Sequence, residues 1–190
     1  LNSLEYMPTR MTNVQAFFQR ELSPESGFDE LKKQLYERIQ KSPDETIYPE
    51  MMIWTHMQQG DFMAALRQAK ALDKRLDENG SRIYRLAQMA AREKKYDASI
   101  AAYEYIINEK GQTCPYYIDG KQKLLAAKRK RLLDGYAYTT EELKSLETEY
   151  EEFLNVLYAF IDSVGTSYNN SGSAAEMSRY EERVRHLLGH

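Results

Sequence analysis

The chain has 190 residues, of which 42% are hydrophobic and 29% are charged, a balance typical of folded globular proteins rather than disordered ones. Its net charge of -3 argues against a generic nucleic-acid binder, which is usually basic, and its single cysteine, Cys114, excludes an internal disulfide. No stretch approaches the roughly 20 consecutive apolar residues of a membrane-spanning helix.

The chain begins Leu1-Asn2-Ser3, without an initiator methionine or an apolar signal core. We interpret it as a processed product or a piece of a longer protein from which a targeting segment was removed. One thiol fits a reducing compartment, but it also fits an exported domain that uses no disulfides. Cytoplasmic and periplasmic locations therefore both stay open.

Six amphipathic helices are predicted before residue 112, because apolar residues recur there at helical spacing and Gly or Pro residues separate the runs. The expected inward stripes are Val14, Phe17, Phe18 and Leu22; Phe28, Leu31, Leu35 and Ile39; Met52, Ile53, His56 and Met57; Phe62, Ala65, Leu66, Ala69 and Leu72; Ile83, Leu86, Ala87 and Ala90; and Ile100, Tyr103, Ile106 and Ile107.

The residues between these stripes predict where the helices begin and end. Pro49 suits the first position of the third helix. The expected N-caps of the next three helices are Asp61, Ser81 and Asp97. Asn79-Gly80 is expected to end the fourth helix.

Longer helices are predicted after residue 112. One runs from Tyr116 to Leu133. Thr139, with Glu142 three residues later, is a capping-box signature that opens the longest helix. The apolar stripe of that helix, Leu143 to Val164, holds for about six turns. Residues 165–173 have a loop composition, and a last amphipathic helix is expected to carry Met177, Tyr180, Val184 and Leu187.

A repeat links the first helices, since Phe28, Phe62 and Tyr96 are each 34 residues apart. Aligning on them brings Ala65 into register with Ser99. A small residue at this position lets the second helix of each unit approach the first closely. One helix pair cannot bury its own apolar face, so the units are expected to stack.

The run Gln59-Gly60-Asp61-Phe62, followed by Ala65-Leu66 and Leu72, resembles a tetratricopeptide repeat, and Lys95-Tyr96-Asp97 begins a more distant copy. The resemblance covers about residues 12–111. It implies an all-α fold, an α-α superhelix of antiparallel helix pairs. Residues 1–11 would form an N-terminal arm, and residues 112–190 would form longer helices that extend or cap the stack.

In this repeat family the first helix of each unit lines a concave groove. The resemblance places seven candidate partner-binding residues there: Glu50, Trp54, Met57, Gln58, Tyr84, Gln88 and Arg92. Aromatic, Met and Arg side chains commonly anchor interfaces, although an ordinary solvated surface is the competing interpretation. Glu50 and Trp54 occupy two positions of the Lys/Asn clamp by which some family members grip a terminal carboxylate, so a chaperone-tail receptor is not expected.

No catalytic, cofactor or metal site is predicted. His56, His186 and His190 lack metal-ligand spacing, and the chain has no paired cysteines and no glycine-rich phosphate loop. Cys114 has no histidine near it in the sequence, which argues against a catalytic thiol. The basic run Lys128-Arg129-Lys130-Arg131 spreads around a helix end, where cations are favoured, rather than forming one nucleic-acid patch.

We therefore expect a non-enzymatic interaction or scaffolding module that binds a protein or peptide in this groove. Two alternatives stay open. The helix from Leu143 to Val164 could drive self-association into a homo-oligomer. The chain could also be a regulatory domain of a larger enzyme or assembly, with a site built from residues far apart in the sequence.

Overall fold

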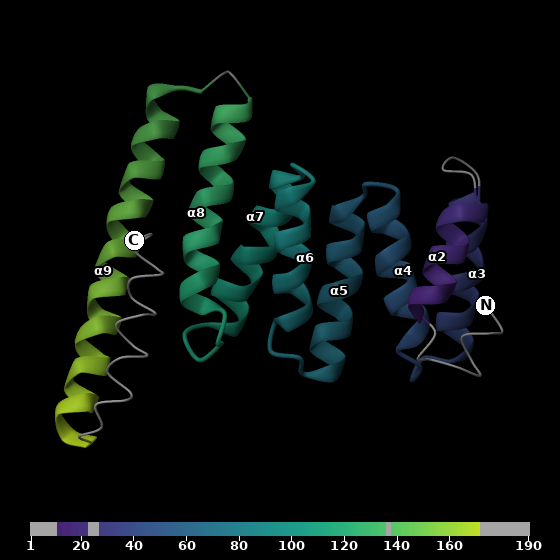
Figure 1. The fold of residues 1–190 in the computed structure, drawn as a ribbon, viewed down its shortest axis with the longest axis horizontal. Helices are drawn as coiled ribbons and strands as arrows, with labels where there is room; N and C mark the ends of the chain where they lie inside the picture. Colours follow the sequence, from purple (N-terminus) through teal and green to yellow (C-terminus); the bar gives the residue numbers. More distant parts are fainter. Residues whose placement is uncertain (1–10, 23–26, 136–137, 172–190) are drawn as a thin grey trace. The chain divides into compact units, whose positions relative to one another are not determined.

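The computed structural model of the chain describes residues 11–22, 27–135 and 138–171, with side chains to residue 160 and at residue 162. This part holds no strand, which confirms the all-α prediction. The elements, labelled in Figure 1, are α2 (Met11–Glu21), α3 (Gly27–Lys41), α4 (Ile47–Gln58), α5 (Phe62–Leu76), α6 (Ser81–Arg92), α7 (Tyr96–Tyr105), the π-helical turn η2 (Ile106–Lys110), α8 (Tyr117–Asp134) and α9 (Thr140–Ser171).

The chain divides into two compact units, Leu1–Ala102 and Tyr103–His190, with the boundary inside α7. In the first unit α3 packs on α4, α4 on α5 and α5 on α6, while α2 also contacts α4. Short turns join α4, α5 and α6, so consecutive helices run in opposite directions (Figure 1). As a result, α4 and α6 run in the same direction on either side of α5.

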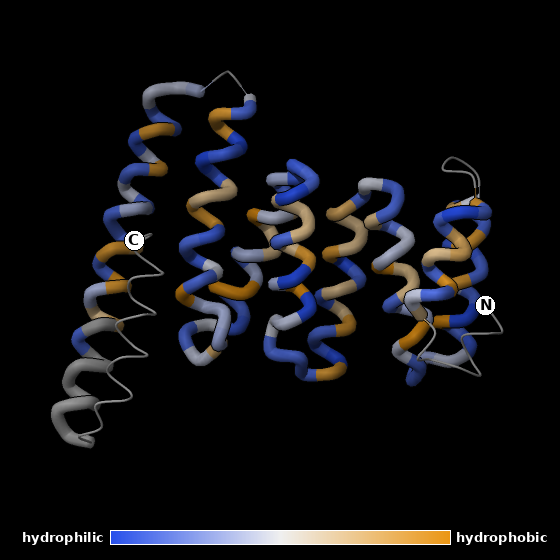
Figure 2. Tube along the Cα trace, in the orientation of Figure 1, coloured by the Kyte–Doolittle hydropathy of each residue, from blue (hydrophilic) through white to orange (hydrophobic). Residues whose placement is uncertain are grey.

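Helix α4 is buried on most of its surface, because its sequence is apolar around most of its circumference (Figure 2). The helix begins at Ile47, with Thr46 as its N-cap, so Pro49 is its third residue rather than the first as predicted. A backbone N–H has no intrahelical partner anywhere in the first turn, which explains why proline is tolerated at this position too. The buried residues of α4 are Ile47, Tyr48, Pro49, Met51, Met52, Ile53, Thr55 and His56.

Helix α5 confirms its predicted cap and its predicted stripe. The Asp61 carboxylate accepts a hydrogen bond from Ala64 N at 2.9 Å, which satisfies one of the free donors of the first turn. Ala65 and Ala69 are completely buried, and their short side chains let α4 and α5 pack closely. Every residue of the predicted inward stripe is buried: Phe62, Ala65, Leu66, Ala69 and Leu72.

The predicted boundary between α5 and α6 was wrong by a few residues. Helix α5 ends at Leu76 with Asp77 as a left-handed C-cap, and Gly80 is the N-cap of α6, so Ser81 is the first helical residue. The reason is a tertiary bond: the buried Asp73 carboxylate accepts from Gly80 N at 2.7 Å and thereby shapes the loop.

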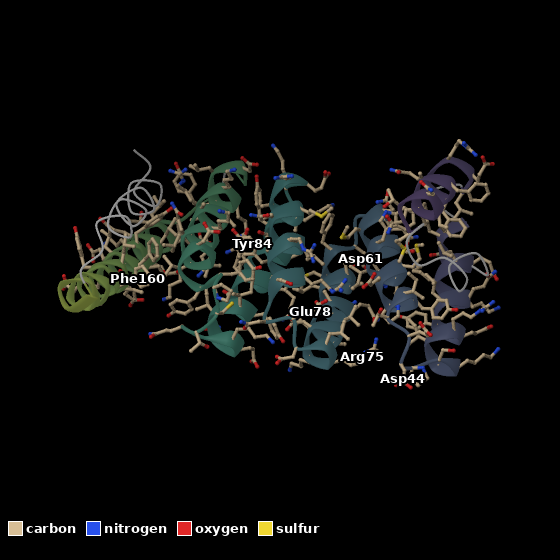
Figure 3. All side chains as sticks on the ribbon, turned by 60° about the horizontal axis from the view of Figure 1, so that its bottom comes forward. Asp44, Asp61, Arg75, Glu78, Tyr84 and Phe160 are labelled. Carbon is tan, nitrogen blue, oxygen red and sulfur yellow. The ribbon has the colours of Figure 1, made fainter. Side chains whose placement is uncertain are left out.

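One smaller difference concerns the start of another helix in this unit. Asp97 lies in the first turn of α7, where the helix dipole favours an acid, and not at the N-cap. The guanidinium of Arg75 donates to the Pro43 carbonyl and, at 3.3 Å, to the Glu45 carbonyl. It thus holds the α3–α4 loop, where Asp44 lies, against the end of α5 (Figure 3).

In the second unit, α8 and α9 pack along each other around a core of Leu125, Leu146 and Phe153. The predicted capping box is confirmed. Thr139 N donates to Glu142 Oε2 at 2.8 Å, and Glu142 N donates to Thr139 Oγ1 at 3.1 Å. Helix α8 also begins and ends within one residue of its predicted bounds. No helix within the described ranges combines the length and apolar character needed to cross a membrane.

Three predictions in the second unit were wrong. Residues 165–171 continue α9 rather than forming a loop, since extending an existing helix adds one hydrogen bond for each residue that is ordered. Leu143 is 43% exposed rather than inward. The π-helical turn η2 shifts the side-chain register, so Tyr105 is buried and Ile107 is only half-buried. The predicted helix with Met177, Tyr180, Val184 and Leu187 lies outside the described residues.

Candidate partner-binding face

Four of the seven candidate residues lie on the side of α4 that the core leaves open. Glu50, Trp54 and Met57 are half-buried and Gln58 is exposed, while the remaining sides of α4 are covered. The helix carrying these side chains is therefore held rigidly, because its backbone is surrounded by packed neighbours. Such a support favours precise presentation of a binding surface.

Part of the Trp54 side chain packs on the core, and the rest of it is accessible to solvent. Its ring packs against Phe28 of α3 with the ring centroids 5.9 Å apart and the planes tilted by 58°. It also packs on the core cluster shared by α3 and α4. Half-buried tryptophans of this kind combine a fixed position with a large surface for a partner.

Gln58 lies where α2 approaches α4. Its Oε1 accepts a hydrogen bond from Gln19 Nε2 of α2 at 3.2 Å, and both side chains are exposed. An exposed amide pair is easily exchanged for bonds to water or to a partner. Gln58 therefore marks the α2 border of the candidate face.

Glu50 takes part in an ion-pair network. Arg82 of α6 donates to Glu50 Oε1 at 3.1 Å and to both carboxylate oxygens of Glu78, at 2.6 and 2.8 Å. Burial by itself would lower the pKa of the Arg82 guanidinium, but the hydrogen bonds and charges of Glu78 and Glu50 raise that pKa above its ordinary value. Glu50 thus fastens α4 to α6.

The Arg82–Glu50 bond also shows which edge of α6 faces α4. Met89 follows Arg82 by seven residues, so it lies within about 20° of the same edge. Met57 follows Glu50 by the same seven residues, and α4 and α6 run in the same direction. Met57 and Met89 therefore lie at the same level, two turns beyond the ion pair. We call the surface that these helices share the α4/α6 face: Glu50, Trp54, Met57, Arg82, Arg85 and Met89.

The three candidates on α6 are distributed unequally around this helix. Arg92 is exposed and lies about 80° from Arg82, beside the α4/α6 face. Gln88 is half-buried and lies about 40° from Arg92, on its far side from Arg82. Tyr84 is half-buried and lies about 160° from Arg82, so it borders a different side of α6 (Figure 3). The geometry thus groups Arg92 with the α4 candidates and separates Tyr84 from them.

Sequence reasoning missed two residues of the face, Arg85 and Met89. Arg85 is exposed, and Met89 is 43% exposed, which is unusual for a methionine of an otherwise well-packed helix. The helical period of α6 was available from the sequence. The angle of that helix relative to α4 was not, because it is known only through the contact of Arg82 with Glu50.

His56 lies inward on α4, as its stripe predicted, and is 7% exposed. Neither ring nitrogen has a hydrogen-bond partner. Burial lowers the pKa of His56 below 6.5, and the charges of Lys32 and Arg67 lower it further, while Asp61 opposes them. A neutral, unpaired imidazole here is part of the packing beneath the face rather than of its surface.

The described residues give little support for a metal site or for thiol chemistry at this face. They contain no group of three or more His, Cys, Asp or Glu side chains that could hold a metal ion. Cys114 is a buried thiol in the second unit, outside the α4/α6 face. The side chains on α4 and α6 offer apolar contact, charge and hydrogen bonds, which are the interactions found at protein interfaces.

No family model, no curated protein and no solved structure matches this chain. The likeness to tetratricopeptide repeats is therefore one of residue pattern.

Proposed function

We propose that the first unit is a tetratricopeptide-like solenoid and that its α4/α6 face, with Arg92 beside it, binds a peptide or helix of a partner protein. The observation that carries this proposal is an accessible apolar strip on rigid helices. Trp54 and Met57 are half-buried, and Met89 is 43% exposed. Aromatic and methionine side chains held in this way are frequent anchors of protein interfaces.

The repeat itself supports the solenoid part of the proposal. Ala65 and Ser99 are equivalent in the 34-residue period, and both are completely buried. Ser99 Oγ donates to the Ala87 carbonyl at 2.9 Å, which joins α7 to α6 at this position. Two equivalent positions of the 34-residue period are thus both fully buried, as expected for stacked repeats.

The test is a binding measurement with matched variants. A partner captured by the whole chain is purified, and its Kd is measured for the wild type, for Met57→Ala/Met89→Ala and for Tyr84→Ala/Arg92→Ala. We expect the methionine pair to raise Kd by about thirtyfold, the effect of losing a hot spot of about 2 kcal/mol. Leu133→Ala on α8, which truncates a side chain that is 53% exposed, should leave Kd unchanged. Unchanged Kd in both variant pairs, with wild-type circular dichroism, would refute the proposal.

A second function, self-association through α9, has an observation of its own. Leu143, Leu154 and Tyr158 are 43%, 42% and 62% exposed along one flank of the helix. Exposed apolar residues in a row are typical of helices that pair. Light scattering over a range of concentrations tests this, with Leu154→Glu/Tyr158→Glu expected to dissociate any oligomer. A constant monomer mass at every concentration would exclude it.

A further inference from the structure

We infer that the partner segment is acidic: it presents two carboxylates, about two helical turns apart, to Arg85 and Arg92, with an apolar side chain between them on Met89. This inference rests on the proposed function and adds the chemical class of the partner. It is based on which charged side chains of α4 and α6 have an ion-pair partner.

Helix α6 contains three arginines and no acidic residue. Arg82 is neutralised by Glu50 and Glu78. Arg85 and Arg92 are exposed, and neither forms an ion pair with any described residue. The only acid of α4 is Glu50, which already pairs with Arg82.

The face therefore has two unpaired cations and no carboxylate left to neutralise them. The whole chain, by contrast, has a net charge of -3. A local excess of positive charge favours encounter with a negatively charged partner and disfavours pairing of this face with the same face of a second copy.

The spacing of these groups limits the partner further. Arg85 and Arg92 are seven residues apart, a rise of about 10.5 Å along α6, and Met89 lies between them along the axis. Carboxylates seven positions apart on a partner helix have the same separation. A guanidinium can bind a carboxylate through two parallel hydrogen bonds, and an apolar neighbour such as Met89 reduces the water that would weaken them.

Nucleic acid also offers regularly spaced anions, but it fits this face less well. Met57 and Met89 stand at one level beside the arginines, and a phosphate backbone has no apolar group for them. An amphipathic acidic peptide supplies both parts of the complement. The partner class is accordingly a protein segment with acidic and apolar residues interleaved.

The experiment selects binders from a displayed library of random 16-residue peptides on the whole chain. Recovered peptides are synthesised and titrated by fluorescence anisotropy, and the emission of Trp54, the one tryptophan of the chain, reports binding at the face. We expect enrichment of Asp and Glu around a large apolar residue. We also expect Arg85→Gln/Arg92→Gln to raise Kd about tenfold or more and added salt to weaken binding.

Arg129→Gln is the matched control, because Arg129 is an equally exposed arginine on α8, and its Kd should stay at the wild-type value. Suppose that the selected peptides bind Met57→Ala/Met89→Ala more weakly but show no acidic enrichment and the same Kd for the arginine variants. That result would overturn the acidic partner and leave the proposed function intact. Recovery of no peptide, or only of peptides insensitive to every face variant, would overturn both. Equal competition by a DNA oligonucleotide would overturn the apolar requirement and with it the partner class.

Discussion

Arg82 Nη2 of α6 lies 3.1 Å from Glu50 Oε1 of α4, although 32 residues separate them in the chain. Both side chains are partly shielded, with 19% and 34% of their surfaces exposed. Arg82 is held at the same time by Glu78, so its edge of α6 faces α4 while the buried stripe of α6 packs on α5. That orientation decides which α6 residues border the α4/α6 face.

The Glu50–Arg82 pair is expected to contribute modestly to the stability of the first unit. A double-mutant cycle with Glu50→Gln and Arg82→Gln should give a coupling of about 0.5–1 kcal/mol at low salt, since the pair is partly open to solvent. Urea unfolding followed by Trp54 fluorescence measures it. Asp119→Asn, which removes an ion pair of α8, is the control and should leave this transition in place. A coupling of zero at low salt would contradict the role given to the pair.

Acid should destabilise the first unit through His56. Its pKa in the folded state lies below 6.5, mainly because the ring is buried, so the unfolded chain binds the proton first as the pH falls. The stabilisation is therefore complete above about pH 6.5 and is lost as the pH falls from there through the lowered folded-state pKa.

Replacing His56 by Leu removes this titration and the two unpaired ring nitrogens. We expect His56→Leu to flatten the stability profile below pH 6.5 and to raise the unfolding free energy at neutral pH by about 1 kcal/mol. His56→Gln separates loss of titration from gain of apolar packing. Urea midpoints between pH 7.5 and 5 measure both effects, and equal slopes in the wild type and the Leu variant would disprove the assignment.

The small size of Ala65 should be essential to the packing of α4 on α5. Ala65→Leu introduces three carbon atoms at a completely buried position and should cost about 1–3 kcal/mol or more. Ala71→Leu makes the same change at an exposed position of the same helix and should alter stability by less than about 0.5 kcal/mol. Thermal unfolding compares the two. Equal losses at both sites would mean that the close approach of the helices does not depend on Ala65.

Asp73 should hold the turn between α5 and α6. Its carboxylate is buried and accepts from Gly80 N, so Asp73→Ala leaves a buried donor unpaired and should cost about 1–3 kcal/mol. Asp73→Asn keeps an acceptor oxygen, and a smaller loss is expected. Chemical denaturation distinguishes the variants, and an Asn variant as unstable as the Ala variant would show that accepting this hydrogen bond is not the function of Asp73.

Much of the local structure was predictable because it depends on neighbours in the sequence. The stripe of α5 repeats with the helical period, and Asp61 caps that helix through a donor three residues away. The Thr139–Glu142 capping box is local in the same way. The boundary prediction at Gly80 failed because the conformation of this residue depends on the Asp73 carboxylate of the preceding helix, seven residues earlier.

The candidate face was predictable only in part. The resemblance to tetratricopeptide repeats placed Trp54 and Met57 on the face, whereas the helical stripe of α4 had placed Met57 inward. In the structure both are half-buried. Assigning Arg85 and Met89 to the face requires the rotation of α6 relative to α4. The sequence contains no measure of the angle between two helices that are not adjacent in the chain.

Residue pattern alone predicted the helices of the described ranges, the 34-residue period of the first part and a close helix pair at Ala65. The pairing of Glu50 with Arg82 and the lack of a hydrogen-bond partner for the inward-facing ring of His56 are visible only in the folded chain. The difference comes from how far apart in the chain the interacting residues are. Helix formation and capping involve residues within a few positions, whereas burial and ion pairing involve side chains brought together from separate helices.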